Sequence, residues 1–178
     1  HPPGYPTYTL LLKVFATLVP FGDFAHRGNL LSALLASAAV GTLYWVITRF
    51  CRCLRPEGSP LFWIASATLG SLVFATSPLF WSQATVTEVY ALNTLFVGLL
   101  LLLASQVALR GPADEQPDGT YVTRRMALFG LLLGLGLGNH LTLLAVAVPL
   151  LLWLWAALGW RKVISPWAVG ALVAGLAV

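Results

Sequence analysis

Long apolar runs alternate with short polar segments along almost the whole chain. The runs cover residues 29–50, 60–80, 89–109, 126–138 and 141–158, and another begins at residue 167. Most of them approach the roughly 20 residues that an α-helix needs to cross the apolar core of a bilayer. The pattern predicts an all-α integral membrane protein, a polytopic helical bundle with about five spans, a truncated sixth span and one short helix on the outer face.

The start of the chain predicts a rigid loop followed by that short helix. Three prolines and a glycine in residues 1–6 exclude regular helix there. Residues 7–19 then read as a helix that is interrupted by Lys13 and is too short to span, so we expect it to lie along the membrane surface. Asp23 is well placed to cap a further helix that begins near Phe24.

The polar hinge at residues 77–93 separates the second and third runs and is the centre of the pattern. Pro78 cannot donate a helix hydrogen bond, and Thr85 followed by Glu88 has the form of an N-capping box for the next helix. We therefore predict a tight turn at one membrane face. Further along, residues 110–125 are predicted to be a flexible loop, and glycines at positions 130, 134 and 138 predict a packing face against a neighbouring helix.

Composition agrees with the membrane class. The chain is 58% hydrophobic and only 9% charged, and its mean hydropathy is +0.84. The net charge of +4 does not indicate a nucleic-acid partner, because the cations are scattered over short loops without a basic stripe. Cys51 and Cys53 lie in an Arg-rich loop that we expect to be cytoplasmic, so neither a disulfide nor a metal site is predicted. No cofactor is predicted either.

The distribution of cations predicts the orientation of the chain. If the spans alternate, Lys13 and Arg27 fall on one side of the membrane, and the other cations fall on the opposite side: Arg49, Arg52, Arg55, Arg110, Arg124, Arg125, Arg161 and Lys162. By the positive-inside rule the Arg-rich side is cytoplasmic. The outer side then collects nearly all the chemically versatile groups, including all three histidines, and is where we expect a site.

Several outer residues have two open interpretations. Glu88 either caps its helix or organises a polar cavity, since an ionisable group in a span costs about 2.5–3.5 kcal/mol and usually marks a cavity. His140 is either a proton carrier or a hydrogen-bond donor that binds phosphate, or it is an interfacial residue bonded to a carbonyl. Arg27 and Lys13 either bind phosphate or extend towards lipid headgroups. A set of aromatic residues either lines a sugar or lipid site or forms an aromatic belt, namely Tyr5, Tyr8, Trp81 and Tyr90.

Four motifs in order resemble one family. They are HPPGYP, RGNLLSALLAS, SPLFWSQATVTEVYALN and GLGLGNHLTLL, and they cover almost the whole chain. Together they resemble the bacterial relatives of the transmembrane protein O-mannosyltransferases, within the GT-C class of polytopic glycosyltransferases. The resemblance implies transfer of a mannose or related hexose from a polyprenyl-phosphate-linked donor to a protein or glycan acceptor on the outer face, in a bacterial plasma membrane.

The resemblance also implies a set of substrate-binding positions. These are His1, Tyr5, Arg27, Asn29, Gln83, Glu88, Tyr90, Asn93, Asn139 and His140. In such enzymes an acidic residue of the first outer loop is the general base, and the family's acidic motif lies just upstream of HPPGYP. The catalytic base is thus expected before His1, and Asp23 is not assigned that role.

The chain begins with His1 rather than Met and stops inside an apolar run, so residues 1–178 are expected to be part of one polytopic transmembrane glycosyltransferase domain that is truncated at both ends. An alternative function stays open: a transporter or lipid-handling protein whose outer cavity binds a headgroup without chemistry. A purely structural membrane subunit is the weaker third interpretation, because it would not need the outer polar residues.

Overall fold

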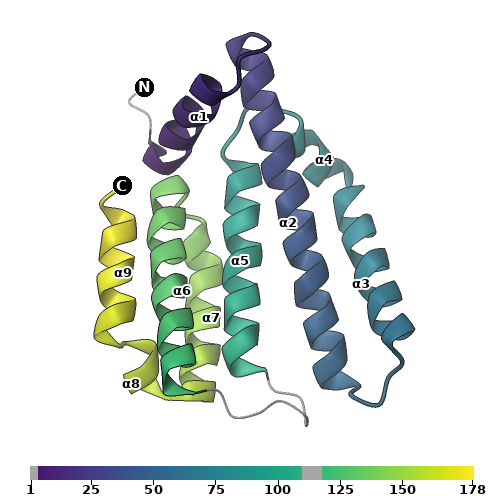
Figure 1. Cartoon of the computed structure of the whole chain (residues 1–178), viewed down its shortest axis with the longest axis vertical. Coiled ribbons are helices and arrows are strands. Elements are labelled where there is room, and N and C mark those ends of the chain that lie inside the picture. The colour runs from purple at the N-terminus through teal and green to yellow at the C-terminus, as the bar shows by residue number, and fades with distance from the viewer. Residues whose placement is uncertain (1–3, 110–117) are drawn as a thin grey trace.

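The longer helices run side by side and reverse direction at the two ends of the molecule (Figure 1). The computed structural model describes residues 4–109 and 118–178, and His1 therefore lies outside the described residues. The helices are α1 (Pro6–Leu18), α2 (Phe24–Leu54), α3 (Pro60–Ala75), α4 (Pro78–Ala84), α5 (Tyr90–Ala108), α6 (Gly119–Asn139), α7 (Leu143–Leu158), α8 (Trp160–Val163) and α9 (Pro166–Leu176). The expected all-α bundle is confirmed for this part of the chain.

Helix α5 lies at the centre of the bundle. It packs against α2 on one side and against α6 and α7 on the other. Its buried residues Phe96 and Leu100 belong to the same apolar cluster as Phe129 of α6 and Leu154 of α7. Helices α3 and α4 pack on α2, and α9 packs on α6, so the two outer layers flank one core.

Two predicted helices are confirmed, and the start of one of them has the predicted side-chain cap. The Asp23 carboxylate accepts a hydrogen bond from the His26 backbone N–H at 2.8 Å, and α2 begins at the next residue, Phe24. The short helix expected over residues 7–19 is α1. Helix α2 continues through Cys51 and Cys53 to Leu54, so the Arg-rich loop is shorter than predicted.

Other boundaries differ from the predictions. Residues 119–125 are the first two turns of α6 instead of part of a flexible loop; residues 110–117 lie outside the described residues. The run at 60–80 is two helices, α3 and α4, bent by 70° at the break. The capping box at Thr85 and Glu88 does not form. The Thr85 hydroxyl donates back to the carbonyl oxygens of Trp81 and Ser82, and α5 begins without a side-chain cap.

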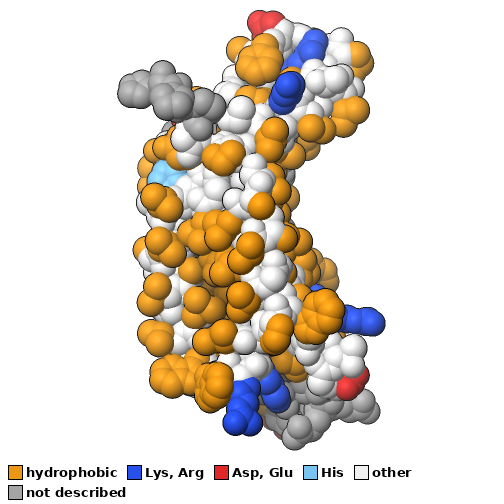
Figure 2. Space-filling model, turned by 90° about the vertical axis from the view of Figure 1, so that its left-hand side faces the viewer, with side chains coloured by type: hydrophobic (Ala, Val, Ile, Leu, Met, Phe, Trp, Pro, Cys, Tyr) orange, Lys and Arg blue, Asp and Glu red, His pale blue; other side chains and the backbone are white. Residues whose placement is uncertain are grey.

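Two described helices, α2 and α5, are long and apolar enough to cross a membrane, and the bent pair α3–α4 makes three if it is counted as one span. Helices α7 and α9 are apolar but shorter. Figure 2 shows hydrophobic side chains over the middle of the molecule and Lys and Arg side chains towards its ends. This surface fits a membrane helical bundle, while the expected number of spans is not confirmed.

The predicted glycine face exists. A Cβ atom at Gly130 would meet the backbone of Ala168, and one at Gly134 would meet the backbone of Leu172 and Gly175, so α6 and α9 approach backbone to backbone. A Cβ at Gly138 would instead meet the Thr7 side chain of α1 at 2.8 Å. Small residues thus determine how closely α9 and α1 lie against α6.

The helix directions separate the charged groups by end. We call the end where α2 and α5 begin and α6 finishes the site end, and the opposite end the Arg-rich end (Figure 1). The described cations of the Arg-rich end are Arg49, Arg52, Arg55, Arg124, Arg125, Arg161 and Lys162. The side chain of Arg49 turns inward there and donates to the carbonyl oxygens of Ser105 at 2.8 Å and Leu109 at 2.8 Å, at the C-terminus of α5.

Candidate functional site

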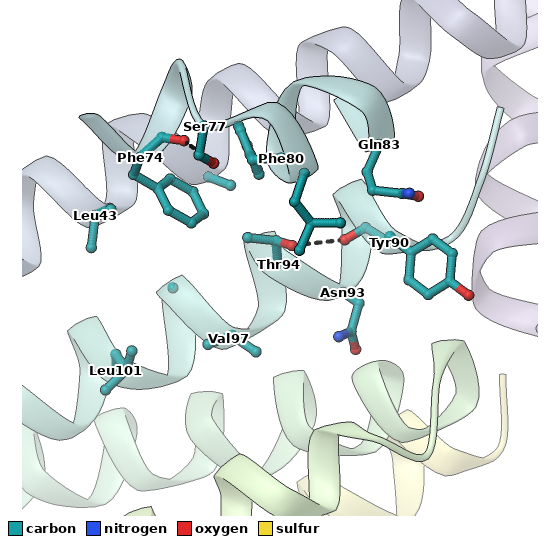
Figure 3. Close-up of a pocket in the computed structure, with 13 residues that line it drawn as sticks. Leu43, Phe74, Ser77, Phe80, Gln83, Tyr90, Asn93, Thr94, Val97 and Leu101 are labelled. Atoms are coloured by element: carbon teal, nitrogen blue, oxygen red, sulfur yellow. Dashed lines mark hydrogen bonds between the residues drawn. The ribbon is translucent and has the colours of Figure 1, made fainter. Parts of the chain in front are cut away.

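A cavity of about 680 Å³ lies near the site end between α2, the bent pair α3–α4 and α5 (Figure 3). One part of its wall is apolar and includes Leu43, Val97 and Leu101. The other part carries neutral polar groups, namely Ser77, Gln83, Tyr90, Asn93 and Thr94. The volume falls in the range of small-molecule sites, about 300–1,000 Å³. The cavity therefore suits a ligand with an apolar chain and a neutral, hydroxyl-rich or amide-rich head.

The bend between α3 and α4 opens this cavity. The Ser77 hydroxyl donates to the Phe74 carbonyl oxygen at 2.8 Å, and Pro78 occupies the first turn of α4, where its missing N–H costs nothing. The rings of Phe74 and Phe80 lie 4.4 Å apart across the bend and both line the cavity. The proline break predicted from the sequence thus lies in the wall of the cavity.

Three rings from three separate segments meet beside the polar part of the cavity. The Tyr5 ring stacks on the His140 ring with centroids 5.5 Å apart and planes 8° from parallel. The Tyr90 ring lies 5.8 Å from the His140 ring at an angle of 41°. We call Tyr5, Tyr90 and His140 the ring cluster. Tyr90 also lines the cavity, so the ring cluster and the cavity are continuous.

The His140 ring has one nitrogen committed to the turn between α6 and α7. Its Nδ1 accepts from the Thr142 backbone N–H at 3.2 Å, and the Thr142 hydroxyl lies 2.7 Å from the same nitrogen. Because Nδ1 accepts the N–H of Thr142, the N–H group of the ring is on Nε2. In this form His140 presents a hydrogen-bond donor on the edge of its ring that faces away from the turn.

Two asparagine side chains next to the ring cluster have unpartnered oxygens. Asn139 is fully buried and its Nδ2 donates to the Val89 carbonyl oxygen at 3.2 Å, at the start of α5. The Oδ1 atoms of Asn139 and Asn93 are both buried and have no hydrogen-bond partner within residues 4–109 and 118–178. Buried polar atoms are nearly always paired, so each of these oxygens calls for an explanation.

A hydrogen bond connects the hinge to the first turns of α2. The Thr87 hydroxyl donates to the Asn29 Oδ1 at 2.6 Å, and a Cβ atom at Gly28 would lie 2.5 Å from the Thr87 hydroxyl oxygen. Only glycine at position 28 allows the hinge to approach α2 this closely. Asn29 thus holds the segment that leads into Tyr90.

Glu88 follows Thr87 in the sequence, and its side chain is exposed. Its charge acts on Tyr8, which is buried on α1: burial raises the pKa of Tyr8, the Ser32 hydroxyl lowers it, and the Glu88 charge raises it. Neither the Tyr8 hydroxyl nor the Ser32 hydroxyl has a hydrogen bond of good geometry in the described part of the chain. Glu88 is therefore an exposed side chain whose charge acts on the buried Tyr8, and it does not cap α5.

Arg27 lies in the first turn of α2 and is half-buried. Its Nη1 donates to the Ala16 carbonyl oxygen at 2.7 Å, and its Nε donates to the carbonyl oxygens of Phe21 at 3.2 Å and Gly22 at 3.1 Å. These bonds satisfy carbonyl groups at and beyond the end of α1. Lys13 lies on α1 and is exposed. Neither cation lines the cavity.

The structure brings some of the predicted site residues together. Tyr5, Tyr90 and His140 touch, and Gln83, Tyr90 and Asn93 line the cavity. Arg27, Asn29, Glu88 and Asn139 lie at the same end, but Asn29, Arg27 and Asn139 each have a bond to the protein itself, and His1 is outside the described residues.

Sequence reasoning did not assign Thr87, Ser32 or Thr94, whose roles depend on contacts between distant segments. The one feature of the sequence that could have pointed to Thr87 is its position next to Glu88 in the hinge. Among the described residues, no group of three or more His, Cys, Asp or Glu side chains is arranged to hold a metal ion.

Comparison with known proteins gives a consistent set of relatives. Residues 1–164 match the model of the family described as the protein O-mannosyl-transferase TMEM260 N-terminal domain. The chain is 34% identical over 154 residues to the mouse protein O-mannosyl-transferase TMEM260, which covers 86% of the chain and 20% of the relative. It is 27% identical over 164 residues to the protein of the same name from Dictyostelium discoideum, covering 86% of the chain and 18% of the relative.

The chain thus spans about a fifth of the length of these curated relatives. No solved structure gives a significant match to it. The expected bacterial source and bacterial plasma membrane stay predictions, since the relatives named above come from mouse and Dictyostelium.

Proposed function

Because the chain belongs to the family of the protein O-mannosyl-transferase TMEM260 N-terminal domain, we propose that it forms the lipid-donor-binding part of a membrane mannosyltransferase. The donor is a mannose, or a related hexose, linked to a polyprenyl phosphate. The acceptor is a hydroxyl group of a protein or glycan at the outer face of the membrane. The enzyme is of the GT-C type and embedded in the bilayer through several spans.

The observation that carries this proposal is the two-part wall of the cavity. A polyprenyl chain needs an apolar surface that opens towards lipid, and Leu43, Val97 and Leu101 provide one. The hexose needs hydrogen-bonding groups at a membrane face, and Gln83 and Asn93 provide them.

In the proposed reaction the acceptor oxygen forms a bond to the anomeric carbon while the bond from that carbon to the phosphate oxygen breaks. The phosphate keeps the bonding electrons and leaves as polyprenyl phosphate, and the general base takes the hydroxyl proton. Negative charge therefore builds on the phosphate, where positively charged or N–H donor groups stabilise the transition state. We assign this role to Arg27 and to the Nε2–H group of His140, and we expect the general base in a segment before His1.

The orientation follows from the charges. Most of the described cations lie at the Arg-rich end, which the positive-inside rule assigns to the cytoplasm. The cavity, the ring cluster and Glu88 then face the outer side. A transporter or lipid-handling protein stays the alternative, and one observation favours it: no charged side chain lines the cavity.

Filling the apolar part of the cavity tests the proposal. Val97→Trp in the full-length protein, reconstituted in lipid nanodiscs, should abolish binding of a mannosyl-phosphoryl polyprenol and mannose transfer to acceptor peptides. Val148→Trp is the matched control, because Val148 is exposed on α7 away from the cavity. Full transfer by a folded Val97→Trp protein would overturn the donor site. Donor binding by the wild type without transfer to any hydroxyl acceptor would support the lipid-handling alternative.

A further inference from the structure

Guanidinium groups lie over aromatic rings at the Arg-rich end, away from the cavity. The pairs are Arg52 with Trp63, Arg55 with Phe62, Arg125 with Tyr121 and Arg161 with Trp160, at 5.5, 5.6, 5.0 and 5.5 Å from the ring centroids. In the described part of the chain, the site end has no such pair. Aromatic side chains at the end of a membrane bundle lie at the depth of the lipid headgroups, so the paired cations lie there as well.

Two of these pairs share the turn between α2 and α3. Arg52 is in the last turn of α2 and Arg55 follows that helix, and we call these two residues the turn arginines. The ring nitrogen of Trp63, in the first turn of α3, donates to the Arg55 carbonyl oxygen at 3.1 Å. A Cβ atom at Gly58 would lie 2.8 Å from the same nitrogen. The turn is therefore packed closely on the Trp63 ring, which fixes the surface over which the Arg52 guanidinium lies.

The N–H donors of the turn arginines are available to a ligand. Both side chains are exposed, and within residues 4–109 and 118–178 neither guanidinium bonds to an oxygen atom or pairs with Glu57, the acidic residue of the same turn. The N–H groups of Arg49 and Arg27, by contrast, bond to backbone carbonyl oxygens. A guanidinium presents five N–H donors in a planar fork that matches phosphate oxygens. The turn arginines can therefore bind a phosphate group.

The surroundings of the turn arginines indicate which phosphate compound fits. Leu61 and Ile64, beside the paired rings on α3, are 74% and 49% exposed, and α3 belongs to a candidate membrane span. A soluble phosphate compound would gain nothing from this apolar surface, whereas a phospholipid has a phosphate at the interface and acyl chains beside the helix. The positive-inside rule assigns the Arg-rich end to the cytoplasmic side, and the cytoplasmic leaflet carries anionic lipids that attract arginine.

We propose that Arg52 and Arg55, held over the rings of Trp63 and Phe62, form a binding site for the headgroup phosphate of an anionic phospholipid in the cytoplasmic leaflet, whose acyl chains lie along α3. The ring contacts restrict the two long side chains before the lipid binds, so less conformational entropy is lost on binding. This site is separate from the cavity and does not depend on the proposed function.

Lipid retention by the full-length protein tests the site. The protein is reconstituted in nanodiscs that contain both phosphatidylglycerol and phosphatidylcholine, and native mass spectrometry measures the apparent affinity for each lipid. One variant combines Arg52→Gln with Arg55→Gln, and a second combines Arg52→Lys with Arg55→Lys, which keeps the charge but removes the planar fork. The matched control is Arg124→Gln, because Arg124 is an exposed arginine at the same end that lies over no ring of the described residues.

The wild type should retain phosphatidylglycerol in preference to phosphatidylcholine. The double glutamine variant should bind phosphatidylglycerol at least about tenfold more weakly, since each arginine near the membrane surface contributes roughly a factor of five. The double lysine variant should fall between this variant and the wild type, and Arg124→Gln should change the affinity less than about twofold.

Two results would overturn the site: no lipid preference in the wild type, or a loss in Arg124→Gln as large as in the double glutamine variant, which would mean that only diffuse charge attracts the lipid. If the double glutamine variant does not fold, the double lysine variant decides, and wild-type affinity in that variant would also overturn the site. Mannose transfer measured on the same preparations is not expected to change, because the turn arginines lie at the end opposite to the cavity.

Discussion

The guanidinium of Arg27 on α2 donates to the carbonyl oxygen of Ala16 on α1 at 2.7 Å. With the bonds to Phe21 and Gly22, this contact holds the short helix α1 against the start of α2. Arg27 was expected from its motif to bind substrate, and the structure adds a second role: it positions the segment that carries Tyr5. The two roles have different consequences when the side chain changes.

Arg27→Ala in the full-length protein should lower both thermal stability and the transfer rate. Loss of hydrogen bonds from a charged donor to three carbonyl oxygens should cost about 1.5–3 kcal/mol of unfolding free energy, and loss of phosphate stabilisation should lower kcat/KM by at least about tenfold. Thermal unfolding and steady-state transfer on the same preparation measure the two effects. If stability falls but the folded fraction transfers mannose at the wild-type rate, Arg27 only positions α1.

Glycine residues form the close contact between α6 and α9. Substituting a glycine inside this contact can be compared with substituting one outside it on the same pair of helices. Gly134→Ala should destabilise the protein by about 1–3 kcal/mol, because the new Cβ would meet the backbone of Leu172 and Gly175. Gly170→Ala on α9 meets nothing within 4 Å and should stabilise by roughly 0.5–1 kcal/mol through helix propensity. Equal effects of both substitutions on the unfolding midpoint would contradict the close packing.

Local signals predicted the elements well and the site only in part. The cap at Asp23 and the packing face formed by the glycines of α6 were predicted correctly, because each depends on a few neighbouring positions in the sequence. The predicted capping box does not form, because the Thr85 hydroxyl donates to carbonyl oxygens of the preceding helix, α4. The stack of Tyr5 on His140 joins residues that are far apart in the sequence, so no local pattern predicts it.

Arg49 gives a prediction for the Arg-rich end. Its side chain bonds carbonyl oxygens at the last turn of α5, so Arg49→Ala should lose about 2 kcal/mol of unfolding free energy. Arg52→Ala is the comparison: Arg52 is exposed, with its guanidinium 5.5 Å from the Trp63 ring centroid, and should lose no more than about 1 kcal/mol. Thermal unfolding in one detergent measures both variants. A larger loss for Arg52→Ala would contradict this account of Arg49.

The orientation is testable by thiol labelling. In a background with Cys51→Ser and Cys53→Ser, a cysteine in place of the exposed Ser82 should react with an impermeant thiol reagent added to intact cells. A cysteine in place of Glu57, which is exposed at the Arg-rich end, should react only after permeabilisation. The reverse result would assign the cavity to the cytoplasmic side and remove the outer-face acceptor from the proposal.

Glu88 now has a sharper test, because the structure excludes the helix cap that would explain a carboxylate at this position. As an exposed side chain without that role, it should contribute little to folding: Glu88→Ala and Glu88→Gln should each change unfolding free energy by no more than about 0.5 kcal/mol. If the carboxylate organises the site through its charge, both variants should lower kcat/KM to a similar extent, since glutamine keeps the shape and removes the charge. The measurement is thermal unfolding beside mannose transfer for the two variants and the wild type. Full activity of Glu88→Gln, with a stability loss confined to Glu88→Ala, would mean that the side chain acts through hydrogen bonds to the hinge, and Glu88 would then be removed from the proposed site.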